Sequence, residues 1–117
     1  MTSDTFRELA LRLPGAEERA HMGHPDFRVG GRVFATLGHP RPGWAMVKLT
    51  PDAQTTFVRS QPKAFVAVKG AWGERGCTHV LLARATVASV RAALSMAHEA
   101  AAGRGRTGGR RSRPPRA

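Results

Sequence analysis

The stretch Pro25-Asp26-Phe27-Arg28-Val29-Gly30-Gly31-Arg32-Val33-Phe34-Ala35-Thr36-Leu37 contains two runs of β-prone residues separated by two adjacent glycines. A two-residue glycine linker between such runs predicts a β-hairpin with a tight turn. The register imposed by this turn places Phe27 opposite Phe34. It also places Arg28 and Arg32 beside the tip of the hairpin, on opposite faces. The sequence therefore predicts a basic hairpin with one apolar face.

Three amphipathic helices are predicted on either side of this hairpin, over residues 3–13, 50–60 and 86–103. In each segment the apolar residues recur at intervals of three and four, as one face of a helix requires. Pro14-Gly15 ends the first helix, and Thr50-Pro51-Asp52 is a typical helix start. Thr86 is the expected cap of the third helix, which we expect to end at Gly103.

Further strands are predicted over residues 17–21, 44–49 and 78–82, the first of them polar and suited to a sheet edge. The resulting order is α-β-β-β-β-α-β-α, with no alternation of strands and helices and no internal repeat. Consecutive strands followed by helices are typical of an antiparallel β-sheet packed by helices. We therefore predict a single α+β domain.

The length of 117 residues suits one modest hydrophobic core, and no apolar run approaches the length of a membrane span. The first four residues, Met1-Thr2-Ser3-Asp4, lack the basic and then apolar pattern of a signal peptide. The single cysteine excludes an internal disulfide framework. These features predict a cytoplasmic protein without a membrane partner, and they leave the oligomeric state open.

The net charge of +11 is concentrated at the C-terminus, where residues 103–117 contain six arginines and no acid. Residues 1–102 retain thirteen basic and eight acidic residues, a net charge of +5. We predict a folded domain over residues 1–102 and a disordered Arg/Gly-rich basic tail over residues 103–117. Such a tail is suited to contacts with nucleic-acid backbones or to keeping the chain soluble. Its candidate contact residues are Arg104, Arg106, Arg110 and Arg111.

A glycine-rich loop over residues 69–79 carries Trp72 between three glycines. It lacks the lysine and Ser/Thr order of a P-loop and leads into a strand rather than a helix, so nucleotide hydrolysis is not expected. A large aromatic ring in such a loop is usually buried. We therefore expect Trp72 to hold the loop against the fold, with Lys69 and Arg75 outside it.

Two groups of residues suggest catalysis or metal binding, and neither is complete. Cys77 and His79 alternate along a strand as a thiol–imidazole pair, but the sequence offers no third residue to orient them. His21-x-x-His24, with His39 or His79, has no known ligand spacing for zinc. The sequence therefore predicts no enzymatic activity, no catalytic residue, no metal site and no cofactor.

Five blocks of the sequence resemble the MmcQ/YjbR family of small bacterial proteins, and the resemblance covers about residues 5–101. The blocks are Leu13-Pro14-Gly15-Ala16-Glu17-Glu18, His24-Pro25-Asp26-Phe27-Arg28-Val29, Arg32-Val33-Phe34-Ala35, Val47-Lys48-Leu49 and Trp72-Gly73-Glu74-Arg75-Gly76-Cys77-Thr78. The resemblance implies a fold similar to that of the bacterial frataxin homologue CyaY, and a double-wing DNA-binding role. CyaY binds iron through an acidic ridge, whereas the first helix predicted here has only two acids, so iron delivery is not expected.

Two hypotheses about function follow. The first is largely sequence-independent binding of DNA, in which phosphates are contacted by Arg28, Arg32, Arg41, Lys48, Lys69 and Arg75 together with the basic tail. The alternative is a non-enzymatic domain that binds a small molecule or a protein. Its pocket would lie between the sheet and the glycine loop, lined by Trp44, Trp72 and His79.

Overall fold

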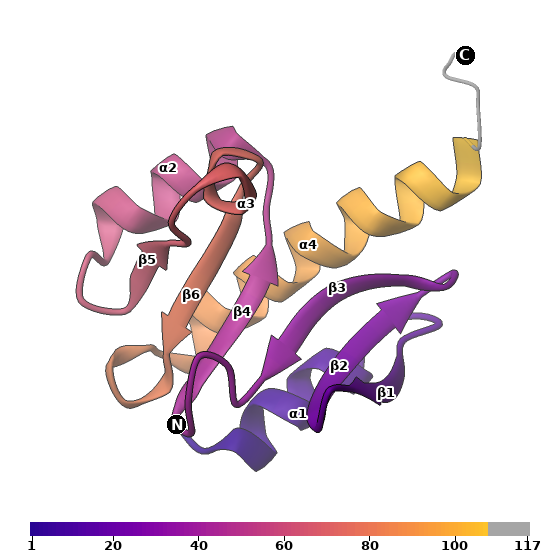
Figure 1. Ribbon diagram of the computed structural model, residues 1–117, viewed down its shortest axis with the longest axis horizontal. Coiled ribbons are helices and arrows are strands. Elements are labelled where there is room, and N and C mark those ends of the chain that lie inside the picture. The colour runs from indigo at the N-terminus through magenta and orange to yellow at the C-terminus, as the bar shows by residue number, and fades with distance from the viewer. Residues whose placement is uncertain (108–117) are drawn as a thin grey trace.

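A six-stranded antiparallel sheet forms the centre of the computed structural model, which describes residues 1–107 (Figure 1). The spatial order of the strands is β1-β2-β3-β4-β6-β5. The first four strands are therefore neighbours in sequence and in space, and β6 inserts between β4 and β5. The strands are β1 (Glu17–His21), β2 (His24–Val29), β3 (Arg32–Leu37), β4 (Trp44–Lys48), β5 (Phe65–Ala67) and β6 (Cys77–Leu81).

The helices are α1 (Ser3–Leu11), α2 (Pro51–Ser60), α3 (Ala71–Glu74) and α4 (Val87–Thr107), with a 3-10 turn at Leu82–Arg84. A threonine hydroxyl caps each of the three long helices. Thr2 accepts a hydrogen bond from the amide of Thr5 at 3.1 Å, and Thr50 accepts one from Ala53 at 3.2 Å. Thr86 accepts one from the amide of Ser89 at 3.1 Å. Each cap satisfies one of the amides that a helix start leaves without a partner.

The hydrophobic core lies between one face of the sheet and the helices α1 and α4, which pass behind the sheet in Figure 1. Phe6 of α1 contacts Phe27 of β2, and Leu94 of α4 is fully buried. Helix α2 packs at the other end of the sheet, where the ring of Phe57 packs at a tilt against Phe65 of β5, with 5.0 Å between ring centroids. The opposite face of the sheet is not covered by these long helices.

The predicted α+β fold and the order of its long elements are confirmed, and two short elements add to them. Strand β5 pairs with β6 over three residues, and the one-turn helix α3 lies inside the glycine-rich loop. The last helix extends to Thr107 rather than ending at Gly103. A glycine inside a helix costs only about 1 kcal/mol relative to alanine, so it need not end the helix. The remainder of the predicted tail, residues 108–117, lies outside the described residues.

The β2–β3 hairpin has the predicted Gly-Gly turn, but the predicted pairing of Phe27 with Phe34 is wrong. A bulge shifts the register between Phe27 and Arg28, so that Phe27 pairs with Ala35 instead. A bulge adds one residue to one strand and bends it locally. Both phenylalanines are consequently buried in the core without facing each other directly.

Close backbone contacts fix the glycine-rich loop to the rest of the fold. A Cβ atom added at Gly73 would lie 1.5 Å from the carbonyl oxygen of Val68, and one at Gly76 would lie 1.9 Å from that of Leu49. The side-chain amide of Gln54 donates hydrogen bonds to the carbonyl oxygens of Gly73 and Cys77, at 2.9 and 3.0 Å. The two glycines therefore permit an approach that no other residue allows.

We predict that Gly73→Ala and Gly76→Ala each lower the free energy of unfolding by more than about 2 kcal/mol, because a methyl group would collide with backbone. Gly30→Ala is the control: Gly30 has a positive φ of 58°, as Gly76 has one of 110°, but nothing lies within 4 Å of an added Cβ. Its cost is expected to be about 1–2 kcal/mol from backbone strain alone. Urea denaturation measures all three variants, and equal losses would contradict the proposed collision.

Candidate functional site

The uncovered face of the sheet carries a row of four paired residues, three of them polar. Asp26 of β2 pairs with Thr36 of β3, Thr36 pairs with Met46 of β4, and Met46 pairs with His79 of β6. Directly paired residues of antiparallel strands present their side chains to the same face. The neighbouring register positions, such as Ala35 and Val47, are buried in the core. The alternation of side chains along the strands therefore places the carboxylate, hydroxyl and imidazole groups of this row on the face that the long helices leave open.

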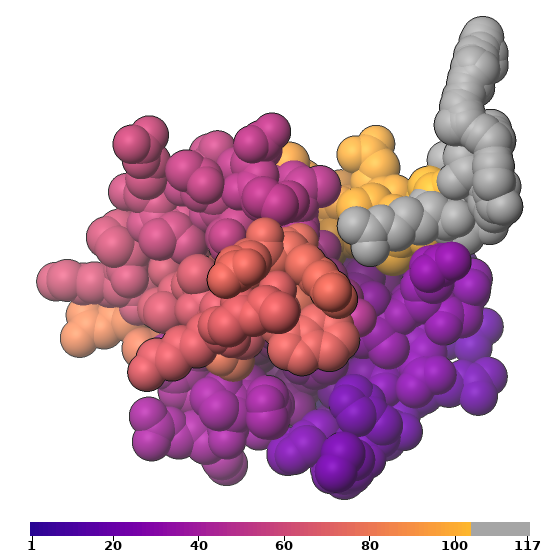
Figure 2. All heavy atoms as spheres, turned by 45° about the horizontal axis from the view of Figure 1, so that its top comes forward, coloured from indigo at the N-terminus to yellow at the C-terminus, as the bar shows by residue number. Residues whose placement is uncertain are grey.

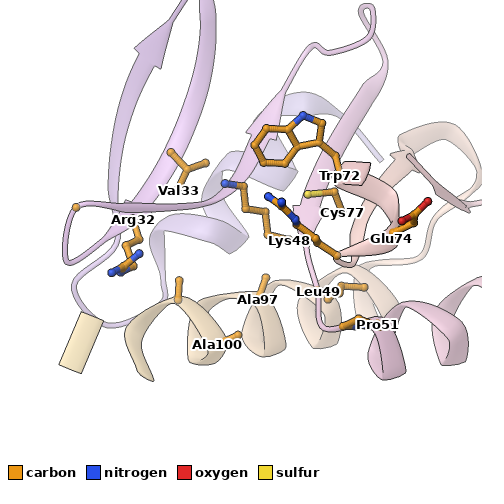
Figure 3. A pocket seen from close by; sticks show the side chains of 13 residues that line it. Arg32, Val33, Lys48, Leu49, Pro51, Trp72, Glu74, Cys77, Ala97 and Ala100 are labelled. Atoms are coloured by element: carbon orange, nitrogen blue, oxygen red, sulfur yellow. The ribbon is translucent and has the colours of Figure 1, made fainter. Parts of the chain in front are cut away.

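A hollow of about 630 Å³, here called the wedge, lies where the start of β3 and the end of β4 separate (Figure 3). These two strands are paired only over Ala35–Leu37 and Ala45–Val47 within the described chain, which leaves their other ends apart. Small side chains of α4 form the floor. The wedge is lined by Arg32 and Val33, Lys48 and Leu49, Trp72 and Arg75, and by Ala97, Ala100 and Ala101 of α4.

A second hollow of about 730 Å³, here called the open-face hollow, lies over Thr36, Met46 and His79 of this row. It extends from the β1–β2 turn to the glycine-rich loop. Its lining includes Met22, His24 and Arg28, then Thr36, His39, Met46 and His79, and finally Val68 and Trp72. Lys48 and Trp72 line both hollows, which are therefore adjacent.

Trp72 separates the two hollows and lies on the surface, so the prediction that it is buried is wrong. Its side chain is 59% exposed. The loop is anchored by the backbone contacts of Gly73 and Gly76, which leave the indole outside the core. Lys48 Nζ lies 5.7 Å and Arg75 Cζ 5.8 Å from the centroid of the ring, both within the range of cation–π contacts. Figure 2 shows the salmon-coloured residues around α3 projecting from the middle of this face.

Three of the six basic domain residues singled out from the sequence line the wedge: Arg32, Lys48 and Arg75. None of these three forms an ion pair within the described part of the chain. Glu74 is the acidic member among the described lining residues, and its carboxylate points away from Lys48 in Figure 3. The wedge therefore concentrates positive charge.

The other basic candidates are placed differently. Arg41 and Lys69 are exposed and line neither hollow. Arg28 lies in the open-face hollow on the other side of the hairpin from the wedge. The side chains of Arg104 and Arg106 are not among those the structure describes, and Arg110 and Arg111 lie outside the described residues.

Arg28 is held by Asp26, whose carboxylate is completely buried. The guanidinium donates two hydrogen bonds to this carboxylate, at 2.8 and 3.0 Å, and His21 Nδ1 lies 2.7 Å from it. The hydrogen bonds from Arg28, reinforced by the contact with His21, hold the pKa of Asp26 below its ordinary value despite the opposing effect of burial. The charge of Arg28 is thus compensated within the protein.

Cys77 and His79 lack the surroundings of an activated thiol–imidazole pair among the described residues. Cys77 is 6% exposed, and burial raises the pKa of its thiol although Lys48 and Arg75 act in the opposite direction. Burial also lowers the pKa of His79, with a smaller effect from His39. Within residues 1–107 the Nδ1 atom of His79 has no hydrogen-bond partner, so no residue orients the imidazole as a base.

The alternative pocket predicted from the sequence corresponds in part to the open-face hollow. Trp72 and His79 line the hollow, whereas Trp44 does not line it and packs edge-on against His79 at 5.9 Å.

The described residues contain no group of three or more His, Cys, Asp or Glu residues that could hold a metal ion. Over the same part of the chain, every helix is too short or too polar to cross a membrane.

Sequence reasoning missed two residues of this region, Thr36 and Gln54. Thr36 is 6% exposed and its Oγ1 has no hydrogen-bond partner among the described residues. Its position opposite Asp26 depends on the register shift at the bulge between β2 and β3, which no local pattern reveals. Gln54 is recognisable only once its two carbonyl partners are known, because they lie 19 and 23 residues away.

We predict that Asp26→Asn lowers the free energy of unfolding at pH 7 by about 1–3 kcal/mol, because it weakens a buried charged hydrogen-bond network. The pKa of Asp26 is lower in the folded than in the unfolded chain, so its contribution is present above its ordinary pKa of 3.8. That contribution disappears as the pH falls through the folded pKa. The variant should therefore lose less stability than the unchanged protein on acidification below pH 3.8.

Denaturation at several pH values measures this difference, with Glu99→Gln as a control that removes an exposed carboxylate. The control should follow the unchanged protein at every pH. A parallel pH dependence for Asp26→Asn and the unchanged protein would show that Asp26 is not the stabilising group.

We also predict that Cys77 reacts with iodoacetamide at least about tenfold more slowly in the folded protein than in urea, because the thiolate is the reactive form and burial disfavours it. Alkylation followed by mass spectrometry measures both rates, with the unfolded chain as the reference for an accessible thiol. Equal rates in the two states would show that the Cys77 thiol is accessible and that its pKa is not raised by burial, as expected of a nucleophile.

Comparisons with known proteins place this chain in a family. A search among curated proteins finds no match. The chain is similar to the crystal structure of Deinococcus radiodurans protein DR2400, which carries the DUF419 domain, with a TM-score of 0.68 and 17% sequence identity. This similarity covers 82% of the present chain and 75% of the other, and at this identity it concerns the fold alone. The YjbR family model matches residues 11–100, well over half of the sequence, and the chain therefore belongs to the YjbR family.

Proposed function

We propose that this protein binds DNA, mainly through the phosphate backbone, and that the wedge is the centre of the binding surface. The observation that carries the proposal is the convergence of Arg32, Lys48 and Arg75 on one hollow from three separate elements. None of these cations is neutralised by an ion pair within residues 1–107. Unpaired cations of this kind attract phosphates and release counterions from DNA when they bind.

The distribution of charge along the chain supports the same proposal. Residues 1–26 contain five acidic and three basic residues, whereas residues 27–103 contain three acidic and ten basic residues. Of the described acids, Asp4, Glu17 and Glu18 form ion pairs on α1 and β1, away from the wedge. The C-terminal arginines add further positive charge. An approaching polyanion is therefore attracted mainly to the part of the chain that forms the wedge.

The proposed role is binding rather than catalysis. The buried Cys77 with its raised pKa is a poor nucleophile, and His79 has no orienting partner among the described residues. The three basic side chains of the wedge donate hydrogen bonds and positive charge, and Glu74 among its described lining residues points away from Lys48, so a phosphate would be bound rather than transformed. Phosphate contacts of this type position a nucleic acid without reading its sequence.

We predict that the triple variant Arg32→Ala, Lys48→Ala, Arg75→Ala weakens binding to a short DNA duplex and reduces its salt dependence. The slope of log K against log salt should become shallower by about 2.7, because each lost phosphate contact contributes about 0.9. Fluorescence anisotropy with the full chain at several salt concentrations measures both quantities.

The matched control is Arg59→Ala, Lys63→Ala, Arg91→Ala, which removes the same net charge from residues that line neither hollow. Both triple variants retain the C-terminal arginines, so a contribution of the tail is the same in each. Equal loss of affinity in the two variants would mean that only total charge matters, and would refute the wedge as the binding centre.

A further inference from the structure

We propose that the site is built for single-stranded DNA, with one unpaired base stacked on Trp72 and the adjoining phosphates bound by Lys48, Arg75 and Arg32. The inference rests on the proposed DNA binding and adds the structural class of the ligand. Its starting point is the exposed indole of Trp72, which the backbone anchoring of the loop leaves accessible to a ligand. The indole is 59% exposed, although burial of so large a ring would ordinarily stabilise the protein.

The surroundings of Trp72 match those of a stacking platform. Two cations lie within 6 Å of its ring centroid, at 5.7 Å for Lys48 and 5.8 Å for Arg75. In a single strand, every base is flanked by phosphates, so a ring that stacks on the base needs cations close beside it. Proteins that bind single strands without sequence preference combine these two features, a positive groove and exposed aromatic rings.

The two hollows provide separate spaces for the base and the backbone. The wedge has the basic lining, whereas the open-face hollow contributes the apolar side chains of Val68 and Met46 beside Trp72. Because Trp72 lines both, a base stacked on it can lie toward the open-face hollow while its phosphates remain in reach of the wedge. The volume of about 730 Å³ leaves ample room for one base.

Two polar atoms supply an independent indication that the open-face hollow receives a ligand. Thr36 Oγ1 and His79 Nδ1 are the buried side-chain atoms without a hydrogen-bond partner in the described structure. Both residues line this hollow, and Thr36 is 6% exposed. A buried polar group without a partner is costly, and the edge of a nucleobase carries both donors and acceptors that could pair with these atoms.

A DNA duplex would use these features less well. In a duplex the bases are stacked on each other inside the helix, so Trp72 would meet sugar and phosphate instead of an accessible base face. The hairpin tip also offers limited charge for insertion into a groove, since Arg28 is bound to the buried Asp26 and only Arg32 of the pair faces the wedge. An unpaired base uses both the aromatic ring and the neighbouring cations.

The test compares three fluorescein-labelled probes with the full chain: oligo(dT) of about 12 nucleotides, an abasic strand of the same length, and a duplex. Anisotropy gives the affinities. We expect oligo(dT) to bind about 5-fold to 150-fold more tightly than the abasic strand, since stacking of one base accounts for a difference of this size. Unlabelled oligo(dT), but not the unlabelled abasic strand, should also quench the tryptophan emission.

Trp72→Ala should abolish both the preference for oligo(dT) and the quenching, while binding of the abasic strand stays close to that of the unchanged protein. Its remaining indole, Trp44, serves as the internal reference for emission. Trp72→Phe should retain part of the preference, because a smaller ring still stacks. Since Trp72 is mostly exposed, neither substitution is expected to disturb folding.

The outcomes separate this inference from the function on which it rests. Equal affinities for oligo(dT) and the abasic strand without quenching would overturn base stacking, while salt-dependent binding of either probe would leave DNA binding intact. Tighter binding of the duplex than of oligo(dT) would also refute the preference for single strands. Failure of all three probes to bind at low salt would refute the proposed function itself.

Discussion

The close approach of two glycines to neighbouring backbone is the constraint on which the candidate site depends. Gly73 and Gly76 bring the one-turn helix α3 against Val68 and Leu49, at separations that exclude any side chain. The amide of Gln54 then joins the carbonyl oxygens of Gly73 and Cys77. With the loop anchored by backbone, its one large aromatic side chain is not needed for packing. The position of Trp72 on the surface is therefore a consequence of the backbone contacts of Gly73 and Gly76 and not of any contact of the ring itself.

The rest of the site is determined by which face of the sheet the helices cover and by the separation of strands β3 and β4 at one end. Helices α1 and α4 bury one face, and strand alternation then leaves Thr36, Met46 and His79 on the other. The short pairing between β3 and β4 creates the space that the cations enter. On the hairpin, Asp26 forms an ion pair with Arg28, whereas Arg32 on the other side of the tip has no ion pair within the described residues. Local charge in the sequence is thus a poor guide to charge available for a ligand.

Features set by neighbouring residues were predictable from the sequence, whereas features set by distant contacts were not. The three long helices and the Gly-Gly hairpin depend on local periodicity, capping and turn chemistry, and they are confirmed. The bulge beside Phe27 was missed because a register shift depends on packing across the strands. The burial expected for Trp72 was wrong because average behaviour of aromatic rings cannot anticipate the contacts of Gly73. Of the basic residues, the sequence identified the members of the wedge but could not separate them from Arg41 and Lys69.

The wedge remains open only if the residues of α4 on its floor have small side chains, and this constraint is separate from the stability of the fold. Ala97 is fully buried and its size is dictated by the core, but Ala100 is only half-buried and has room for a larger residue as far as packing is concerned. A longer side chain at position 100 would fill the gap between β3 and β4 and block the wedge sterically. The small residues of α4 therefore set the depth of the site, and a bulky side chain in place of the methyl group of Ala100 would fill the cavity while the fold is kept.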